Sequence, residues 1–536
     1  MPGNTDSPGE AKTWAARQYL SAVDAANRGD WQRALPALRA LAAANPELPH
    51  VHHLLSVAAL AIGSFDEALA HSLKALELKK GDVEFLLQAA RAISHAQSPQ
   101  RALTIAHEAV PLAWNNAGIC QQLSVIFARA NAYDAASRLS ARAIELSPGD
   151  TRNVFNHATT SLFNGDLPAA EAAYRHVLVR EPTHAQAHLG LAQLRKWTPE
   201  ENNIQRLTTS LAQTRDAVGR MYLHLALGKE CEDIGDYARA FRHFTAGKTI
   251  GKGLLRFGTQ ADHACFDALS EGAIAIGSTG GCPSEEPIFV VGMPRSGTTL
   301  VDRILSSHSS VQSIGEVLNF PSLVKRVSGS RTPRLIDADT VRAVARIDWT
   351  VLGEDYIGST RPLTGKFPRF IDKHPHNFLY LEMIARALPA ARIIGVRRNP
   401  MDTCLSNFRQ LFSPASPYHG YSFDLIETGR YFVGFHRLMR HFERLLGERI
   451  LWIDYEDLVA DQERQTRRLL DFCGLDWQPA CLRFELNEAP VATASAAQVR
   501  GRLHRDAQDR WRHYASDLQP LMALLHAEGI DVPAQP

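Results

Sequence analysis

A glycine-containing turn after an apolar segment is the part of the sequence best suited to chemistry. The apolar run Ile288–Val291 predicts a buried parallel strand, and the residues after the turn predict a helix with one apolar face. Gly292 and Gly297 occupy the two glycine positions of a phosphate-binding loop, where backbone N–H groups can approach phosphate oxygens. The position that holds lysine in nucleoside triphosphate loops holds Thr298, and the cation stands earlier, as Arg295. The sequence therefore predicts a site for a phosphate-bearing donor without the usual binding of a triphosphate and Mg²⁺.

A second apolar segment leads into a pair of arginines. Ile393–Val396 predicts another buried strand, and Pro400 favours the first turn of a helix that follows it. Arg398 and Ser406 lie eight residues apart. An arginine at the end of a strand can bind a phosphate through two N–H donors, and a hydroxyl on the helix can add a third. The alternative is that Arg397 and Arg398 are solvated surface charges.

The loop Pro294-Arg-Ser-Gly-Thr-Thr299 and the later Arg398–Ser406 spacing, in this chain order, resemble the donor site of sulfotransferases. These enzymes take a sulfuryl group from 3′-phosphoadenosine 5′-phosphosulfate (PAPS). The form of the loop is most similar to that of tyrosylprotein and related bacterial sulfotransferases. The resemblance implies that the 3′-phosphate is bound by Arg398 and Ser406, and the 5′-phosphosulfate by Arg295, Ser296, Gly297, Thr298 and Thr299.

Two further segments extend this resemblance to the rest of the nucleotide. Tyr455 resembles a tyrosine near the adenosine pocket, with a buried ring as its alternative role. The segment 493–500 resembles the one that closes over the nucleotide, so Ser495 and Arg500 are expected to reach the donor phosphates. Trp511, beyond that segment, is expected to pack in a core.

Transfer of a sulfuryl group needs a base for the acceptor proton and positive charge near the bridging oxygen. Glu316 follows Arg295 by 21 residues, which agrees with the catalytic glutamate of tyrosylprotein sulfotransferases, so the resemblance makes Glu316 the general base. Lys373 stands where this family has a lysine at the end of a strand and would stabilise charge together with Arg295. His374 and His376 are rival bases, because cytosolic small-molecule sulfotransferases use a histidine.

The N-terminal half repeats with a period of 34 residues. The fixed position of each repeat is an alanine: Ala34, Ala68, Ala102, Ala136 and Ala170. Three residues before these stand Trp31, Phe65, Pro99, Tyr133 and Leu167. Twelve residues before them stand the small residues Ala22, Ser56, Ala90, Ser124 and Ala158. Repeats end at Pro46, Pro148 and Pro182. This is the tetratricopeptide pattern, in which small residues let two antiparallel helices pack closely.

Beyond Pro182 the period is interrupted. Ala240 fits a further repeat that is displaced by two residues, after an irregular segment at 197–203. Such an array can bind a protein or peptide in its groove, and the alternative is that it only scaffolds the enzyme or mediates self-association.

Composition limits what else the chain could be. The 536 residues are 45% hydrophobic and 21% charged, as in ordinary soluble proteins. The 58 basic and 57 acidic residues nearly balance, so no general attraction to nucleic acid or a membrane surface is expected. The seven cysteines are scattered and predict reduced thiols without a zinc site. No signal peptide or membrane-spanning run is recognisable, which favours a cytoplasmic enzyme. The arrangement of a repeat array before a sulfotransferase domain resembles bacterial two-domain proteins.

These observations predict an all-α tetratricopeptide solenoid followed by an α/β P-loop-like sulfotransferase domain with a parallel sheet. We expect a disordered N-terminus at 1–12, repeats at 13–252, a linker at 253–286 and the sulfotransferase domain at 287–536. The region 328–366 is expected to shape the acceptor pocket.

The predicted activity is sulfuryl transfer from PAPS to a hydroxyl, without a metal, in a chain that could form a homodimer. A protein tyrosine is favoured as acceptor, and a glycan or small molecule remains open. The sequence also leaves open a nucleotide-dependent kinase and an inactive repeat scaffold. The absent loop lysine argues against the kinase, and the intact set of candidate site residues argues against the scaffold.

Overall fold

The computed structural model of the protein describes residues 8–96, 99–271, 280–344, 347–493, 496–503 and 507–532. Contacts within the chain divide it into two compact units, Met1–Thr160 and Ser161–Pro536. Among the described residues, no helix combines the length and the apolar character needed to cross a membrane.

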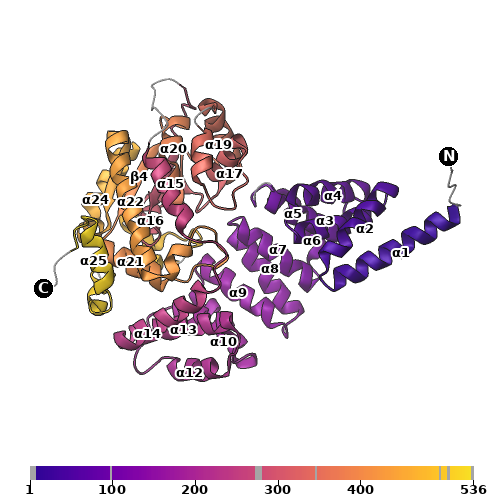
Figure 1. Cartoon of the computed structure of the whole chain (residues 1–536), viewed down its shortest axis with the longest axis horizontal. Coiled ribbons are helices and arrows are strands. Elements are labelled where there is room, and N and C mark those ends of the chain that lie inside the picture. The colour runs from indigo at the N-terminus through magenta and orange to yellow at the C-terminus, as the bar shows by residue number, and fades with distance from the viewer. Residues whose placement is uncertain are drawn as a thin grey trace. The chain divides into compact units, whose positions relative to one another are not determined.

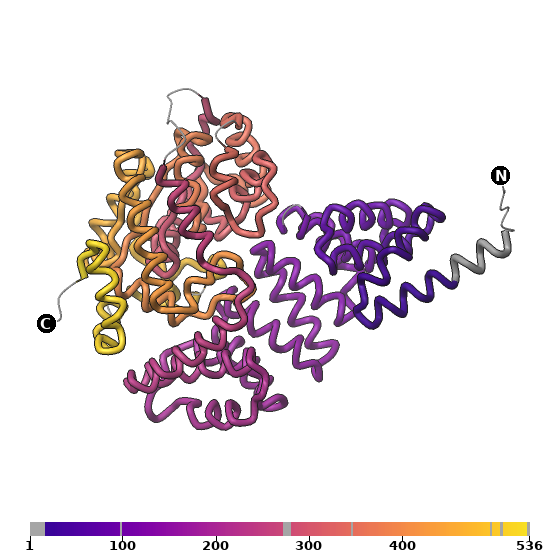
Figure 2. The backbone as a smooth tube through the Cα atoms, viewed as in Figure 1, coloured from indigo at the N-terminus to yellow at the C-terminus, as the bar shows by residue number. Residues whose placement is uncertain are grey.

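The first unit is built from helices that follow one another as hairpins, which can be traced in Figure 2. Its helices are α1 (Pro8–Asn27), α2 (Trp31–Ala44), α3 (Pro49–Ala61), α4 (Phe65–Leu78), α5 (Val83–Ala96), α6 (Leu103–Ala113), α7 (Ala117–Arg129) and α8 (Tyr133–Leu146). Helix α9 (Thr151–Asn164) runs across the point of division.

The repeat pattern of the sequence appears directly in the positions of these helices. Helices α2, α4 and α8 begin at the predicted residues Trp31, Phe65 and Tyr133. The alanine three residues into each is fully buried. The small residues opposite are buried as well, and Ser56 Oγ donates a hydrogen bond to the carbonyl of Ala68 at 2.7 Å. Small side chains therefore bring the two helices of a pair close together, and the predicted tetratricopeptide fold is confirmed.

The second unit begins with further helices of the same kind. They are α10 (Leu167–Arg180), α11 (Ala185–Gln193), α12 (Ile204–Gln213), α13 (Ala217–Asp233) and α14 (Tyr237–Lys252). Helix α14 begins three residues before the buried Ala240, so this pair keeps the repeat pattern despite the interruption. The irregular segment is followed by α12, which packs against α13.

The division by contacts does not follow the domain boundaries expected from the sequence. Helices α13 and α14 pack with the later part of the chain, and α15 (Gln260–Ser270), inside the expected linker, buries Cys265 and Phe266. Residues 1–7 of the expected disordered N-terminus lie outside the described residues, and α1 begins at Pro8. The domain assignment itself stays a prediction.

A parallel sheet of five strands forms the centre of the second unit, as predicted, in the order β2-β3-β1-β4-β5. The strands are β1 (Pro287–Gly292), β2 (Val311–Ser313), β3 (Arg369–Asp372), β4 (Arg392–Arg397) and β5 (Ile450–Asp454). In β1 the side chains alternate between two apolar clusters, with Ile288 and Val290 in one and Phe289 and Val291 in the other. This alternation places one cluster on each face of the sheet.

Helices contribute residues to both clusters, and most of these helices can be located by their labels in Figure 1. Helices α16 (Thr298–Ser306) and α24 (Gln462–Cys473) contribute to the cluster with Ile288. The other cluster includes residues of α17 (Asn319–Ser328), α18 (Ala338–Ala343), α19 (Trp349–Thr364), α20 (Leu381–Ala387), α21 (Pro400–Arg409), α22 (Leu425–Leu446) and α25 (Gln519–Ala527). Shorter elements that matter below are η2 (Pro375–Tyr380), η3 (Gly420–Phe423), α23 (Tyr455–Ala460), η7 (Gln498–Arg500) and η8 (Arg510–Tyr514).

Because all five strands are parallel, their carboxyl ends meet at one edge of the sheet. Every candidate site residue before position 456 either follows one of these ends or lies on the helix after it. Glu316 comes after β2, Lys373 after β3, Arg295 after β1, Arg398 after β4 and Tyr455 after β5. The fold therefore gathers residues that are up to 160 positions apart in the sequence.

Candidate active site

The turn between β1 and α16 is tight enough to need both of its glycines. A Cβ on Gly292 would lie 2.7 Å from the carbonyl oxygen of Val396, on the neighbouring strand. Gly297 has a φ of 108°, and a Cβ there would lie 2.6 Å from the ring of Tyr455. The missing side chains thus let the loop pack against the ends of β4 and β5.

Arg295 holds an unusual backbone conformation within this turn. Its φ is 69°, in the left-handed region that residues other than glycine seldom adopt. The guanidinium donates to Gln498 Oε1 at 3.0 Å and, more weakly, to Ser406 Oγ at 3.4 Å. The structure thus brings together Arg295 of the loop, Ser406 of α21 and the later segment that contains Gln498. Such local strain is characteristic of functional sites.

Several arginines surround this turn. Burial, with the charges of Arg398, Arg409 and Arg510, lowers the pKa of the Arg295 guanidinium to about 9. Like charges held together in a buried place repel one another and favour the binding of an anion. The guanidinium is still protonated at neutral pH, so the turn carries concentrated positive charge.

Two of the three guanidinium nitrogens of Arg398 donate hydrogen bonds, and the third has no hydrogen-bond partner among the described residues. Its Nη1 donates to the carbonyl of Arg295 at 3.0 Å, and its Nη2 donates to the carbonyl of Ala507. The guanidinium lies over the ring of Tyr455, 4.7 Å from the ring centre. Its Nε is buried and, like the buried Oγ of Ser296, has no hydrogen-bond partner among the described residues. Two unsatisfied polar groups at the phosphate loop fit a ligand with phosphate oxygens.

The adjacent arginine behaves differently. Arg397 forms an ion pair with Glu443 at 2.8 Å, and its guanidinium lies 4.0 Å from the ring centre of Trp452. The side chains of the two consecutive arginines at the end of β4 therefore lie in different environments. Only Arg398 contacts the phosphate loop through a hydrogen bond among the described interactions of the pair.

Glu316 and Lys373, which follow the strands β2 and β3 beside β1, form an ion pair. Their Oε1 and Nζ atoms are 2.5 Å apart, with the lysine side chain 1% exposed and the glutamate 37% exposed. The neighbouring strands β2 and β3 position them, and the N–H of Lys373 also donates to the carbonyl of Gly315 at 3.1 Å. A buried cation thus holds a carboxylate that still reaches solvent.

Two buried carboxyl groups lie close to the same lysine. Asp372 accepts hydrogen bonds from Tyr356 Oη at 2.8 Å and from Asn377 Nδ2 at 3.0 Å. Burial raises the pKa of Asp372 to about 7, and it also raises the pKa of Asp302 on α16. In both cases the positive charge of Lys373 opposes the rise. Lys373 is therefore the cation around which the acidic groups of this region are arranged.

The rival bases His374 and His376 are buried rings. Burial, followed by the charge of Lys373, lowers the pKa of His374 to about 3. The pKa of His376, which is 2% exposed, lies well below its usual value because of burial and the charge of His374. His376 packs against the rings of Tyr418 and His419, with ring centres 5.5 and 5.0 Å away. Both rings are neutral over the physiological pH range and are weak bases.

The segment expected to close over the nucleotide lies at the phosphate loop, but its residues differ in what they contact. Thr493 lies 3.4 Å from Thr299 through their hydroxyl oxygens, and Gln498 reaches Arg295. Arg500 instead donates to the carbonyls of Asn487 and Ala489 at 3.3 and 3.1 Å. Ser495 lies outside the described residues.

Other contacts of the site come from residues that the sequence did not single out. Gln498 lies within the segment 493–500 that the sequence had marked, and Arg409 lies three residues after Ser406 on α21. Glu232 lies on α13 and meets Arg409 only through tertiary packing, and no motif in the sequence marks it. The side chain of Trp511 is fully buried, as expected for a core residue, and its backbone N–H donates to Asp402 Oδ1 of α21 at 3.0 Å.

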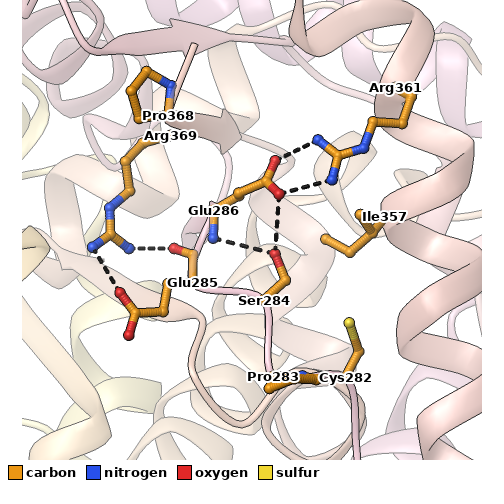
Figure 3. A pocket seen from close by; sticks show the side chains of 9 residues that line it. All are labelled: Cys282, Pro283, Ser284, Glu285, Glu286, Ile357, Arg361, Pro368 and Arg369. Atoms are coloured by element: carbon orange, nitrogen blue, oxygen red, sulfur yellow. Dashed lines mark hydrogen bonds and ion pairs between the residues drawn. The ribbon is translucent and has the colours of Figure 1, made fainter. Parts of the chain in front are cut away.

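A hollow of about 570 Å³ lies at the opposite edge of the sheet, where β1 and β3 begin. Its charged side chains pair with one another, for example Arg361 with Glu286 at 2.5 and 2.7 Å (Figure 3). Arg369 likewise bonds to the backbone carbonyl of Glu285. The hollow thus has its charges already matched and lies away from the residues at the carboxyl edge.

Comparison with known proteins relates part of the second unit to a family. Residues 287–479 match the model of the family described as "Sulfotransferase family". The resemblance seen in the loop and in the Arg398–Ser406 spacing is confirmed at this level. PAPS and the acceptor are not identified by this match.

Two curated relatives are similar over different lengths of the chain. An uncharacterized protein of Aquifex aeolicus (strain VF5) is 30% identical over 387 residues, which are 69% of this chain and 49% of that protein. The chain thus spans about half the length of that relative. A protein of Caenorhabditis briggsae named "Putative protein-tyrosine sulfotransferase" is 27% identical over 236 residues, or 42% of this chain and 81% of that one.

Two solved structures are similar to part of this chain. A tetratricopeptide repeat protein from Parabacteroides merdae ATCC 43184 matches 45% of this chain and 94% of its own, at 16% identity and a TM-score of 0.35. MamA from Desulfovibrio magneticus RS-1 matches 32% and 97%, at 16% identity and a TM-score of 0.29.

Proposed function

We propose that this chain transfers a sulfuryl group from PAPS to an acceptor hydroxyl. One observation carries the proposal: the carboxyl edge of the sheet combines a buried group of arginines at a phosphate loop with an ion-paired glutamate. The unsatisfied Ser296 Oγ and Arg398 Nε fit the phosphate oxygens of such a donor. The match of residues 287–479 to the sulfotransferase family supports the same reaction class.

Different residues of the chain bind the donor, accept the proton and stabilise the developing charge. Arg295 to Thr299 bind the 5′-phosphosulfate, while Arg398 and Ser406 bind the 3′-phosphate and Tyr455 lies beside the nucleotide. Glu316 accepts the proton of the acceptor hydroxyl, whose oxygen then forms a bond to sulfur. As the bond between sulfur and the bridging phosphate oxygen breaks, Arg295 and Lys373 stabilise the negative charge left on that oxygen.

Lys373 has a second task in this mechanism. Its ion pair with Glu316 holds the carboxylate beside the place where charge develops during transfer. The buried, neutral His374 and His376 are poorly suited to the role of base. Glu316 is therefore the base that we propose.

For the acceptor, we propose a tyrosine in a protein or peptide. The support is the form of the phosphate loop and the similarity to the Caenorhabditis briggsae protein. A helical repeat array in the same chain is a surface that can hold an extended peptide.

Titration calorimetry with 3′-phosphoadenosine 5′-phosphate tests the donor site. The wild-type protein should bind this bisphosphate, and Arg398→Ala should weaken binding about 10- to 100-fold, because charge-assisted hydrogen bonds to a phosphate are lost. Arg397→Ala is the matched control: it removes the neighbouring arginine, whose partners are Glu443 and Trp452, and should leave affinity unchanged.

Two results would contradict the proposed donor. If Arg398→Ala and Arg397→Ala lost the same amount of affinity for the bisphosphate, the loss would come from a change at the end of β4 and not from a contact of Arg398 to phosphate. Preferential binding of ATP with Mg²⁺ would replace the sulfotransferase by a nucleotide-dependent kinase.

A further inference from the structure

The helix pair α13–α14, which belongs to the repeat pattern, packs against elements that carry the donor site. The ring of Tyr237 stacks on His513 of η8, with ring centres 4.1 Å apart. Phe241 packs against Phe408 of α21, with ring centres 6.1 Å apart. The fully buried Lys248 donates from Nζ to the carbonyl of Gln410 at 2.6 Å, just beyond the end of α21. The repeat pair and α21 thus share one packed interior.

One acidic side chain of this pair is surrounded by donors from the site. Glu232, near the end of α13, forms an ion pair with Arg409 and lies 3.4 Å from Nη1 of Arg510. It also accepts a hydrogen bond from Tyr514 Oη at 2.7 Å. Its side chain is only 4% exposed. A carboxylate so deeply buried keeps its charge only because several donors share it.

The two arginines that Glu232 contacts are among the three whose charges act on Arg295 of the phosphate loop. The charges of Arg409 and Arg510 both contribute to the lowered pKa of Arg295. Arg409 ends α21, three residues after Ser406, and Arg510 begins η8. Glu232 therefore joins the end of α21 to η8 at the point where both approach the loop.

We propose that Glu232 is a positioning residue for the donor site, so that the last pair of the repeat array sets the affinity for the donor nucleotide. This inference rests on the proposed function. The carboxylate offsets the repulsion between Arg409 and Arg510 and fixes both near Arg295 before an anion binds. Arg398 and Ser406, at the start and middle of the same region, keep their place because α21 is held at its far end.

The test compares Glu232→Gln with the matched control Glu230→Gln in the full-length protein. Glu230 lies on the same helix, is equally buried and accepts from Asn203 Nδ2 at 2.9 Å, away from the arginines. Calorimetry should show about tenfold weaker binding of 3′-phosphoadenosine 5′-phosphate for Glu232→Gln and unchanged binding for Glu230→Gln. In steady-state assays, KM for the donor should rise while kcat changes less, and Glu232→Asp should recover part of the affinity.

Three outcomes would overturn the inference. They are unchanged or tighter binding in a folded Glu232→Gln variant, the same loss in Glu230→Gln, or a fall in kcat alone. If Glu232→Gln does not fold, Tyr514→Phe removes one donor to the carboxylate and should weaken binding about two- to threefold. Unchanged affinity in that variant would also overturn it. Failure of the wild-type protein to bind the bisphosphate would instead contradict the proposed function.

Discussion

The pairing of Glu316 with Lys373 shows how single residues acquire a role from their position on the sheet. They are 57 residues apart in the sequence, but each follows the end of one of two adjacent strands. The lysine is buried and the glutamate reaches solvent, so the pair has one fixed and one accessible partner. The carboxylate can therefore be reached from solvent, while the cation stays in the protein interior.

If Glu316 is the base, Glu316→Gln should reduce turnover by about 100- to 10,000-fold while binding of 3′-phosphoadenosine 5′-phosphate stays as in the wild type. Gln has nearly the same shape and cannot accept the proton, so only the chemical step is affected. The measurement is release of the bisphosphate product in the presence of a tyrosine-containing peptide, with calorimetry on the same preparation.

Glu448→Gln is the matched control for this variant. Glu448 is an exposed carboxylate between α22 and β5, outside the region 328–366, and its replacement should leave turnover unchanged. Full activity of Glu316→Gln would reject the assignment and return attention to the buried His374 and His376.

Local residues of the site were predictable, and distant ones were not. The loop residues 295–299 and the Arg398–Ser406 pair each lie in one strand–turn–helix, where spacing along the chain fixes spacing in space. Glu232 meets Arg409 only through packing of segments far apart in the sequence, and nothing near it in the sequence marks this. Gln498 lies in the segment 493–500 that the sequence marked, but its contact with Arg295 was not predicted. Arg500 was expected at the phosphates, whereas its described hydrogen bonds hold the carbonyls of Asn487 and Ala489.

At the scale of elements, the phosphate loop is supported from the side by the end of β5. Gly297 leaves room for the ring of Tyr455, and the guanidinium of Arg398 lies over the same ring. Loop, tyrosine and arginine thus form a stack in which each part limits the position of the next.

This stack predicts that Gly297→Ala weakens donor binding. The new Cβ would lie 2.6 Å from the Tyr455 ring, which must move and take Arg398 with it. We expect about a tenfold loss of affinity for the bisphosphate, measured by calorimetry. Gly529→Ala is the matched control, since Gly529 also has a positive φ, of 70°, but nothing within 4 Å of the added Cβ.

Both substitutions introduce backbone strain of about 1 kcal/mol, because alanine disfavours a positive φ. Thermal unfolding should therefore show that both variants lose stability, and only Gly297→Ala should lose affinity. Equal affinity in the two variants would mean that the stack does not position Arg398.

The helices and strands were predictable where a period or an apolar run was clear. The alanine period located the starts of α2, α4, α8, α10 and α14, and apolar runs located β1 and β4. The period fails at Pro99, since α6 begins later, at Leu103. The short strand β2 pairs along three residues, which is too little pattern to recognise in a sequence.

At the scale of the whole molecule, the repeat pattern and the compact units do not coincide. The pattern continues through α14, while the contacts assign α10 to α14 to the unit that holds the sheet. Sequence periodicity reports the local pairing of helices and says nothing about what the outer face of a pair contacts. The last pairs thus have the sequence pattern of repeats but pack as part of the unit that holds the sheet.

This arrangement predicts different behaviour for two N-terminal truncations. A fragment of residues 151–536 retains every described contact that builds the donor site, and should bind 3′-phosphoadenosine 5′-phosphate with the affinity of the full chain. A fragment of residues 253–536 lacks Glu232, Tyr237, Phe241 and Lys248. It should unfold at a lower temperature and bind at least tenfold more weakly, because it exposes Phe408 and leaves Arg409 without its buried partner.

Thermal unfolding and calorimetry on the two fragments and the full chain test whether α13 and α14 are needed for stability and for binding of the bisphosphate. If the shorter fragment folds and binds the bisphosphate like the full chain, α13 and α14 are not needed for donor binding. The boundary expected at residue 252 would then separate the donor-binding part of the chain from the repeats. If the longer fragment also loses binding, residues before 151 contribute to the donor site. Retention in the longer fragment and loss in the shorter one would mean that the unit that holds the sheet has incorporated the last helix pair of the array, through Glu232 and the packing of α14.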